Sequence, residues 1–203
     1  ETAVLRAPID HNYMLNDEEH RKLATYFRSF LGSDISLATI VKNLPKQCLV
    51  AGKIRVLGEK ESICGTWAAQ RQSEDTRRDS SFVRLQLLVP TRQQDGRIVD
   101  ISTCFYGCLH YVIQATLPAI PATGIVQDCQ VLAALISLCD TQGDATNNCV
   151  WYSKLQKPIF VHTSTIQCVI GRIQVGRRWG IIDTSINCIR TSFIGPEDID
   201  EET

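Results

Sequence analysis

The sequence predicts a mainly β protein, built as a barrel or a sandwich, with an N-terminal helical arm. Beyond residue 46 the helical spacing of apolar residues disappears, and short runs rich in Val, Ile, Thr and aromatic residues follow one another. Gly, Pro, Asn and Asp, which are typical of turns, bound these runs. Because no helical pattern separates the runs, we expect them to pair in antiparallel sheets.

The expected strands are spread over most of the chain, at residues 48–57, 62–69, 82–89, 98–105, 109–117, 131–139, 159–162, 166–175, 179–183 and 187–193. The sequence Val-Gly-Arg-Arg-Trp at 175–179 is typical of a tight hairpin. Gly107 falls between two strand-like runs and predicts a bulge or a kink. Loops are expected at residues 70–80, 118–128 and 141–148.

A helix is marked clearly at the N-terminal side of this β region. Asn16 can accept a hydrogen bond from the backbone of Glu19, whose side chain can reach back in a capping box. Leu23, Phe27 and Phe30 recur at helical spacing. These three side chains are therefore predicted to pack the helix against the β body.

Gly32 is expected to end this helix, and a short second helix over 37–43 stops before Pro45. The predicted organisation is an N-terminal helical arm at 1–45, beginning with an extended lead-in at 1–12. A β domain at 46–195 follows, and then an acidic, disordered tail at 196–203. Since the sequence does not begin with Met, we expect it to be part of a longer protein.

Composition restricts the class of protein. The chain of 203 residues is 44% hydrophobic and 21% charged, as globular proteins are, and it contains no apolar run long enough for a membrane helix. Its first residues lack the basic and apolar pattern of a signal peptide, so we expect none. Its nine cysteines are odd in number and lie mostly in apolar runs. They predict buried, reduced thiols, without disulfides or bound metal, in the nucleus or the cytosol.

No catalytic residue can be named. Cys104, Cys108 and His110 form the one local cluster of cysteine and histidine, and a second cluster that would complete a tetrahedral zinc site is missing from the sequence. Neither a phosphate-binding glycine loop nor a hydrolase motif is present. The sequence therefore favours a binding module without a cofactor over an enzyme, with a cysteine- or metal-dependent enzyme of unrecognised site as an alternative.

Arginines give the strongest indication of a binding surface. One group lies in a polar loop and another on the expected hairpin, where Arg can bind phosphates beside an aromatic ring. The candidate nucleic-acid contacts are Arg71, Arg77, Arg78, Arg172, Arg177, Arg178 and Trp179. The alternative is that the loop arginines are balanced by acids at 74, 75 and 79, and that Trp179 belongs to the core.

Four segments taken in order resemble the C-terminal β domain of proteins encoded by fungal DNA transposons of the CACTA and Kyakuja–Dileera–Zisupton types. They read Arg-Asp-Ser-Ser-Phe-Val-Arg-Leu at 78–85, Phe-Tyr-Gly-Cys-Leu-His-Tyr-Val-Ile at 105–113, the run at 158–173, and Trp-Gly-Ile-Ile-Asp at 179–183. The helix at 16–31 is similar to the helix that precedes this domain in the family. The segment 118–128 has no counterpart in that pattern.

The resemblance implies a nuclear interaction domain of a mobile-element-derived protein, with any nuclease core outside this sequence. Its partner would be DNA, chromatin or another protein. The strand pattern is also similar to chromatin-reading modules of the bromo-adjacent-homology type, although fold alone does not fix function. A purely architectural domain of a larger protein remains an alternative, and the sequence does not indicate an oligomeric state.

Overall fold

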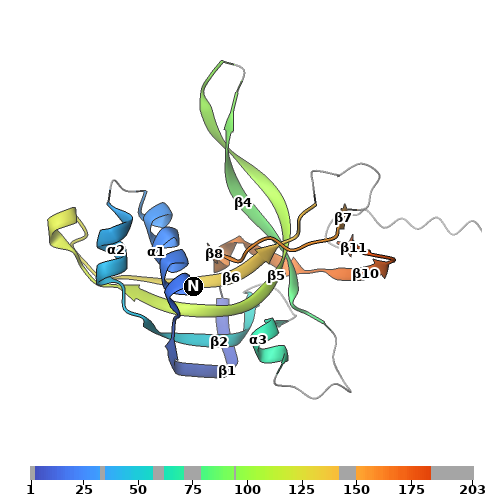
Figure 1. Cartoon of the computed structure of the whole chain (residues 1–203), viewed down its shortest axis with the longest axis horizontal. Helices are drawn as coiled ribbons and strands as arrows, with labels where there is room; N and C mark the ends of the chain where they lie inside the picture. Colours follow the sequence, from blue (N-terminus) through green and yellow to red (C-terminus); the bar gives the residue numbers. More distant parts are fainter. Residues whose placement is uncertain are drawn as a thin grey trace, which may run out of the picture.

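The computed structural model describes residues 3–32, 35–56, 62–70, 79–93, 95–141 and 150–183. An antiparallel sheet of eight strands forms the body, and a sheet of three strands lies beside it (Figure 1). The large sheet contains β1 (Ala3–Met14), β2 (Gln47–Val56), β3 (Ile63–Cys64), β4 (Phe82–Arg92), β5 (Ile98–Leu117), β6 (Cys129–Leu138), β8 (Ile159–His162) and β9 (Ile166–Val169). The small sheet contains β7 (Val150–Tyr152), β10 (Gly171–Val175) and β11 (Arg178–Ile182).

The predicted mainly β class is confirmed, but the large sheet is open and not closed into a barrel. Within the described residues β1 pairs only with β2 and leaves a free edge. The sheet branches at the long strand β5. Its first half, Ile98–Cys108, pairs with β4, and its second half, Gly107–Leu117, pairs with β6. One strand thus belongs to two diverging parts of the sheet.

The helix α1 (Asp17–Leu31) confirms its sequence signals. Asn16 accepts from the backbone N–H of Glu19 at 2.9 Å, and the Glu19 carboxylate accepts from the backbone N–H of Asn16 at 3.0 Å, so the predicted capping box is formed. Gly32 ends the helix in the left-handed conformation, with φ 59°. The second helix, α2 (Leu37–Asn43), has the predicted bounds and is capped by Ser36.

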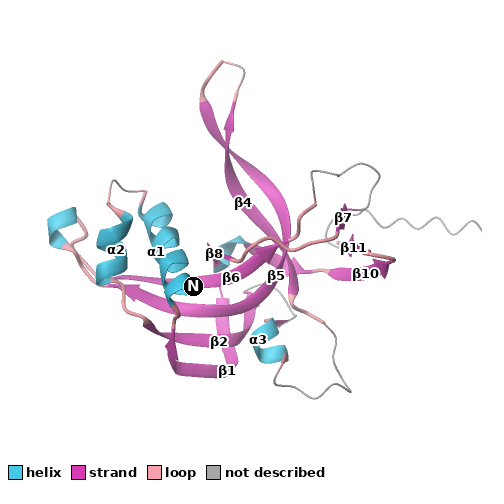
Figure 2. Ribbon diagram, viewed as in Figure 1, coloured by secondary structure: helices cyan, strands magenta, loops and turns pink. Residues whose placement is uncertain are grey.

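Figure 2 shows α1 and α2 together over one face of the sheet. Leu23 and Phe27 of α1 are fully buried and belong to the core between the helices and the sheet. Phe30 contacts the β body, as predicted, but it lies outside this core: its side chain is 50% exposed and stacks between Tyr26 and His162 of β8. Phe30 lies one turn further along the helix, at the edge of the contact between α1 and β8.

Three strand predictions are also wrong. The predicted strand 166–175 is divided into β9 of the large sheet and β10 of the small sheet. Residues 98–105 and 109–117 form one continuous strand, in which Gly107 allows a close approach of β6: a Cβ there would lie 2.6 Å from Cγ2 of Ile136. In the predicted strand 62–69 only Ile63–Cys64 is extended, and α3 (Thr66–Ala69) follows. Ala68 and Ala69 of this turn are buried, a packing contact that the strand-like composition did not reveal.

The N-terminal lead-in is a strand of the sheet, since β1 pairs antiparallel with β2 from Ala3↔Val56 to Met14↔Gln47. Two short 3-10 turns, η2 (Pro121–Thr123) and η3 (Thr163–Thr165), complete the described elements. The predicted strand at 187–193 and the acidic tail lie outside the described residues. No helix in the described part of the chain has the length and apolar character needed to cross a membrane.

The outer halves of β4 and β5 leave the body as a two-stranded hairpin, which Figure 1 shows rising away from the rest of the molecule. We call this hairpin, residues 86–93 and 95–104, the arm. Its exposed apolar side chains are Leu88, Ile98, Val99 and Ile101.

Candidate functional site

The small sheet carries the hairpin that the sequence predicted. β10 and β11 pair from Gly171↔Ile182 to Val175↔Arg178, and Gly176 turns the chain with φ 61°. β7 adds to the other edge of β11, with Trp151 opposite Gly180. Since alternate residues of a strand point to opposite faces, this sheet has an inner face toward the body and an outer face.

Arg172 lies on the inner face, where its side chain contacts two aromatic rings and forms two hydrogen bonds. Its guanidinium carbon is 3.4 Å from the ring centre of Phe82 and 4.4 Å from that of Trp179. The guanidinium donates to the Tyr152 hydroxyl at 2.7 Å and to the Asp79 carboxylate at 2.6 Å. These contacts make Arg172 the centre of a packed cluster that joins the small sheet to β4.

The surroundings of Asp79 keep its carboxylate charged opposite Arg172. Burial by itself raises the pKa of its carboxyl, but hydrogen bonds from the hydroxyl and the backbone N–H of Ser81, together with Arg172, bring the pKa below its usual value. The carboxylate is thus held in the charged form that the guanidinium needs.

The outer face presents apolar and cationic side chains together. Ile173 and Val175 are exposed, and the indole of Trp151 lies across Gly180, where a Cβ would be 3.1 Å from the ring. The glycine therefore leaves room for the ring to cross β11. Arg178, two residues before Gly180, points to the same face and is exposed.

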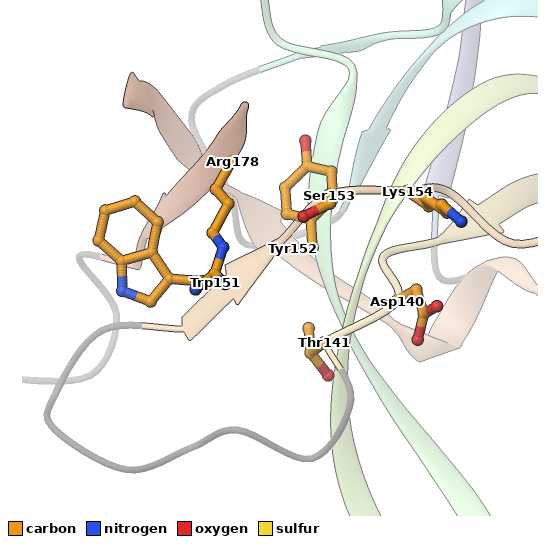
Figure 3. Close-up of a pocket in the computed structure, with 7 residues that line it drawn as sticks. All are labelled: Asp140, Thr141, Trp151, Tyr152, Ser153, Lys154 and Arg178. Carbon is orange, nitrogen blue, oxygen red and sulfur yellow. The ribbon is translucent and has the colours of Figure 1, made fainter. Parts of the chain in front are cut away.

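A cavity of about 230 Å³ opens beside this face (Figure 3). Its lining residues are Asp140, Thr141, Trp151, Tyr152, Ser153, Lys154 and Arg178. In Figure 3 the rings of Trp151 and Tyr152 point apart, as adjacent residues of a strand must, so these two rings do not form an aromatic cage. The cavity instead combines two cations, one carboxylate and three hydroxyl-bearing residues beside one indole.

The structure therefore separates the predicted nucleic-acid contacts. Arg172 and Trp179 lie on the inner face and contact each other, whereas Arg177 and Arg178 are exposed. The loop residues Arg71, Arg77 and Arg78 lie outside the described residues. Sequence reasoning missed Trp151 and Lys154. The run Val-Trp-Tyr at 150–152, which is rich in β-forming residues, was the signal available for Trp151.

The cysteine–histidine cluster does not form a shared site. The Cys108 thiol contacts the Ser81 hydroxyl, while His110 hydrogen-bonds Thr66 at 3.1 Å and Ser137 at 2.8 Å. Nowhere in the described ranges do three or more His, Cys, Asp or Glu residues gather in a way that would hold a metal ion. No disulfide links the seven cysteines within those ranges. Burial raises the pKa of Cys48 and of Cys139 to about 12, which disfavours the nucleophilic thiolate.

His110 leads to a pH prediction. Burial, with a smaller effect from the charge of Lys22, lowers the pKa of its imidazole in the folded protein. The unfolded chain binds a proton near the ordinary pKa of about 6.5, so below that pH the unfolded state holds more protons. The free energy of unfolding should therefore keep its full value above about pH 6.5, and it should decrease as the pH falls from there through the pKa of His110 in the folded protein.

Urea denaturation between pH 5 and 8 measures this dependence. His110→Gln, which keeps hydrogen-bonding groups without titrating, should flatten the slope, while the exposed His11→Gln should leave it as in the parent. Equal slopes for the parent and His110→Gln would contradict the prediction.

No family model, no curated protein and no solved structure matches the chain. The resemblance to transposon-encoded proteins thus stays a prediction, and the function has to be inferred from the residues of the site.

Proposed function

We propose that the chain is a non-catalytic interaction domain that binds a polypeptide partner on the outer face of the small sheet. The partner segment carries a carboxylate, which Arg178 and Lys154 bind in the cavity, next to an apolar side chain that packs on Trp151. The observation that carries this proposal is the cavity itself, where an exposed guanidinium lies beside a half-buried indole. Trp, Tyr and Arg dominate the binding energy of protein interfaces.

Two features favour a polypeptide over a nucleic-acid backbone. Ile173 and Val175 occupy exposed positions that a phosphate-binding face would give to cations. The side chain of Arg172 is committed to Asp79 and Tyr152. Within the setting that the resemblance implies, the partner would be a chromatin or transposase protein.

A nucleic-acid partner is the second candidate, favoured by the exposure of Arg177 and Arg178 on the hairpin. Each phosphate contact contributes a slope of about −0.9 to log affinity against log salt on duplex DNA. Replacing both arginines with Ala should then reduce the slope by up to about two.

The experiment compares two probes on the full chain. Peptides displayed at random are selected for binding, and duplex DNA is titrated in parallel. The selected peptides should combine Asp or Glu with an apolar residue, and Arg178→Ala should weaken their binding about 10–100-fold, because a hydrogen bond to a charged group contributes about 1.5–3 kcal/mol. Trp151→Ala should weaken it as well.

Arg177→Ala is the matched control, since Arg177 is also exposed on the hairpin but does not line the cavity. Its peptide affinity should equal that of the parent. Selection of no acidic peptide, or equal losses for Arg177→Ala and Arg178→Ala, would contradict the proposal. DNA binding with the salt slope given above would favour the second candidate.

A further inference from the structure

The arm exposes an edge of β5 that carries no partner strand within the described ranges. Along Ile98–Cys108 β5 pairs with β4 on one side, and β6 joins its other side only from Gly107 onward. The first half of β5 is therefore an edge strand. Ile98 is 71% exposed, and Val99 and Ile101 are exposed as well.

The hydrogen bond at the tip of the arm fixes which backbone groups point outward. The N–H of Gln93 donates to the carbonyl of Arg97 at 2.8 Å, so Gln93 and Arg97 form a hydrogen-bonded pair. Such pairs alternate with non-hydrogen-bonded pairs along an antiparallel ladder. It follows that Ile98, Asp100 and Ser102 direct their N–H and C=O groups away from β4.

The two edges of the arm differ in how they are protected. Pro90 pairs with Asp100, so it lies at an outward-facing position of β4 and removes one N–H donor from that edge. On β5 the segment 98–104 reads Ile-Val-Asp-Ile-Ser-Thr-Cys and contains no Pro, Gly or Lys. Exposed edges of this β-branched kind are the ones that add a further strand.

We propose that a second copy of this chain binds the β5 edge, antiparallel, strand β5 to strand β5, about a two-fold axis at Ile101. A two-fold axis places identical surfaces against each other, so the register must avoid like charges. Centred on Ile101, it sets Asp100 opposite Ser102 of the other copy and Val99 opposite Thr103. The Ser102 hydroxyl, which already accepts from Gln86 at 2.8 Å, has its hydrogen free to donate to that carboxylate.

The backbone supports the same register. Asp100 and Ser102 both present outward N–H and C=O groups, so each such pair across the axis exchanges two hydrogen bonds. The side chains also match across the axis. In each copy one face of the arm is uncharged, and the proposed register places the two uncharged faces on the same side of the joined sheet. The residues of this face are Leu87, Val89, Val99, Ile101 and Thr103. A hairpin of two strands is marginal in water, and pairing of two arms yields a sheet of four strands.

Sedimentation equilibrium of the full chain over a range of concentrations tests the proposal. The parent should form a dimer, and Ile101→Lys should raise its dissociation constant at least about tenfold, because two like charges then face each other across the axis. Leu88→Lys is the matched control: Leu88 is 69% exposed on the same arm but lies on β4, so the dimer should persist. Ser102→Pro should also dissociate the dimer, since it removes an outward N–H while the pairing with β4 is kept.

A symmetric crosslink tests the register. In the non-hydrogen-bonded pair at the axis the two Cα atoms are about 4.5 Å apart, which a disulfide can bridge. Ile101→Cys treated with diamide, which takes up the two thiol hydrogens, should give a covalent dimer, while Leu88→Cys and the parent should not. A monomer at every concentration, a dimer insensitive to Ile101→Lys and Ser102→Pro, or no crosslink at residue 101 would overturn the proposal. Because these residues lie on the arm, none of these outcomes bears on the cavity.

Discussion

Phe27→Ala is expected to lower the free energy of unfolding by about 3–5 kcal/mol, the range found when a buried aromatic side chain is removed. Phe27 is fully buried, and it belongs to one cluster with Leu23, Ile40 and Leu117 from three different elements. Truncation would leave a cavity that these neighbours cannot close, because they are anchored in α1, α2 and β5. Chemical denaturation measures the loss.

Phe30→Ala is the matched control, with the same substitution three residues further along the same helix. Its ring is half exposed and stacks on Tyr26 and His162, so its loss should cost about 1 kcal/mol or less. Equal losses for the two variants would show that the helix does not pack on the sheet as described.

Arg172→Ala should lower the free energy of unfolding by roughly 2–4 kcal/mol, since it removes charge-assisted hydrogen bonds and cation–π contacts together. The carboxylate of Asp79 loses its guanidinium, and Phe82 and Trp179 lose the group that lies against both rings. Arg172→Lys should recover only part of the loss, because an ammonium cannot reproduce the planar, forked geometry.

Arg178→Ala controls for charge, since Arg178 lies on the same hairpin but is exposed on the outer face. Its effect on stability should stay within about 0.5 kcal/mol. A stability loss as large as that of Arg172→Ala would remove the distinction between a structural arginine inside the sheet and a binding arginine outside it.

Local signals in the sequence predicted the elements whose causes are local. The capping box at Asn16, the glycine at 32 and the turn at 176–177 each depend on residues adjacent in the chain, and all three are confirmed. Helix α2 likewise has its predicted bounds.

The sequence predictions failed where tertiary packing, and not local sequence, determines the secondary structure or the burial of a residue. The strand prediction for residues 62–69 failed because Ala68 packs as a buried helical turn. The helical spacing that included Phe30 could not reveal that its ring lies at the edge of the contact with β8 and stays half exposed.

The candidate site was only partly predictable for the same reason. Arginines could be located on the hairpin, but strand pairing decides which face each one occupies. Arg172 shares a face with Ile181, the residue with which it pairs on β11. Arg178 lies three positions before Ile181 on the same strand, so it points to the opposite face. Trp151 joins the site through β7, a strand of three residues that is too short to show a period.

The most direct test of the proposed interaction domain is the indole N–H resonance of Trp151 in the full chain. The protein, which has three tryptophans, is labelled at these residues, and Trp151→Phe assigns the signal. An acidic, apolar peptide of alternating Glu and Leu should shift the Trp151 resonance, leave those of Trp67 and Trp179 in place, and lose its effect when Gln replaces Glu. No shift at Trp151, or an equal shift with the Gln peptide, would contradict the account.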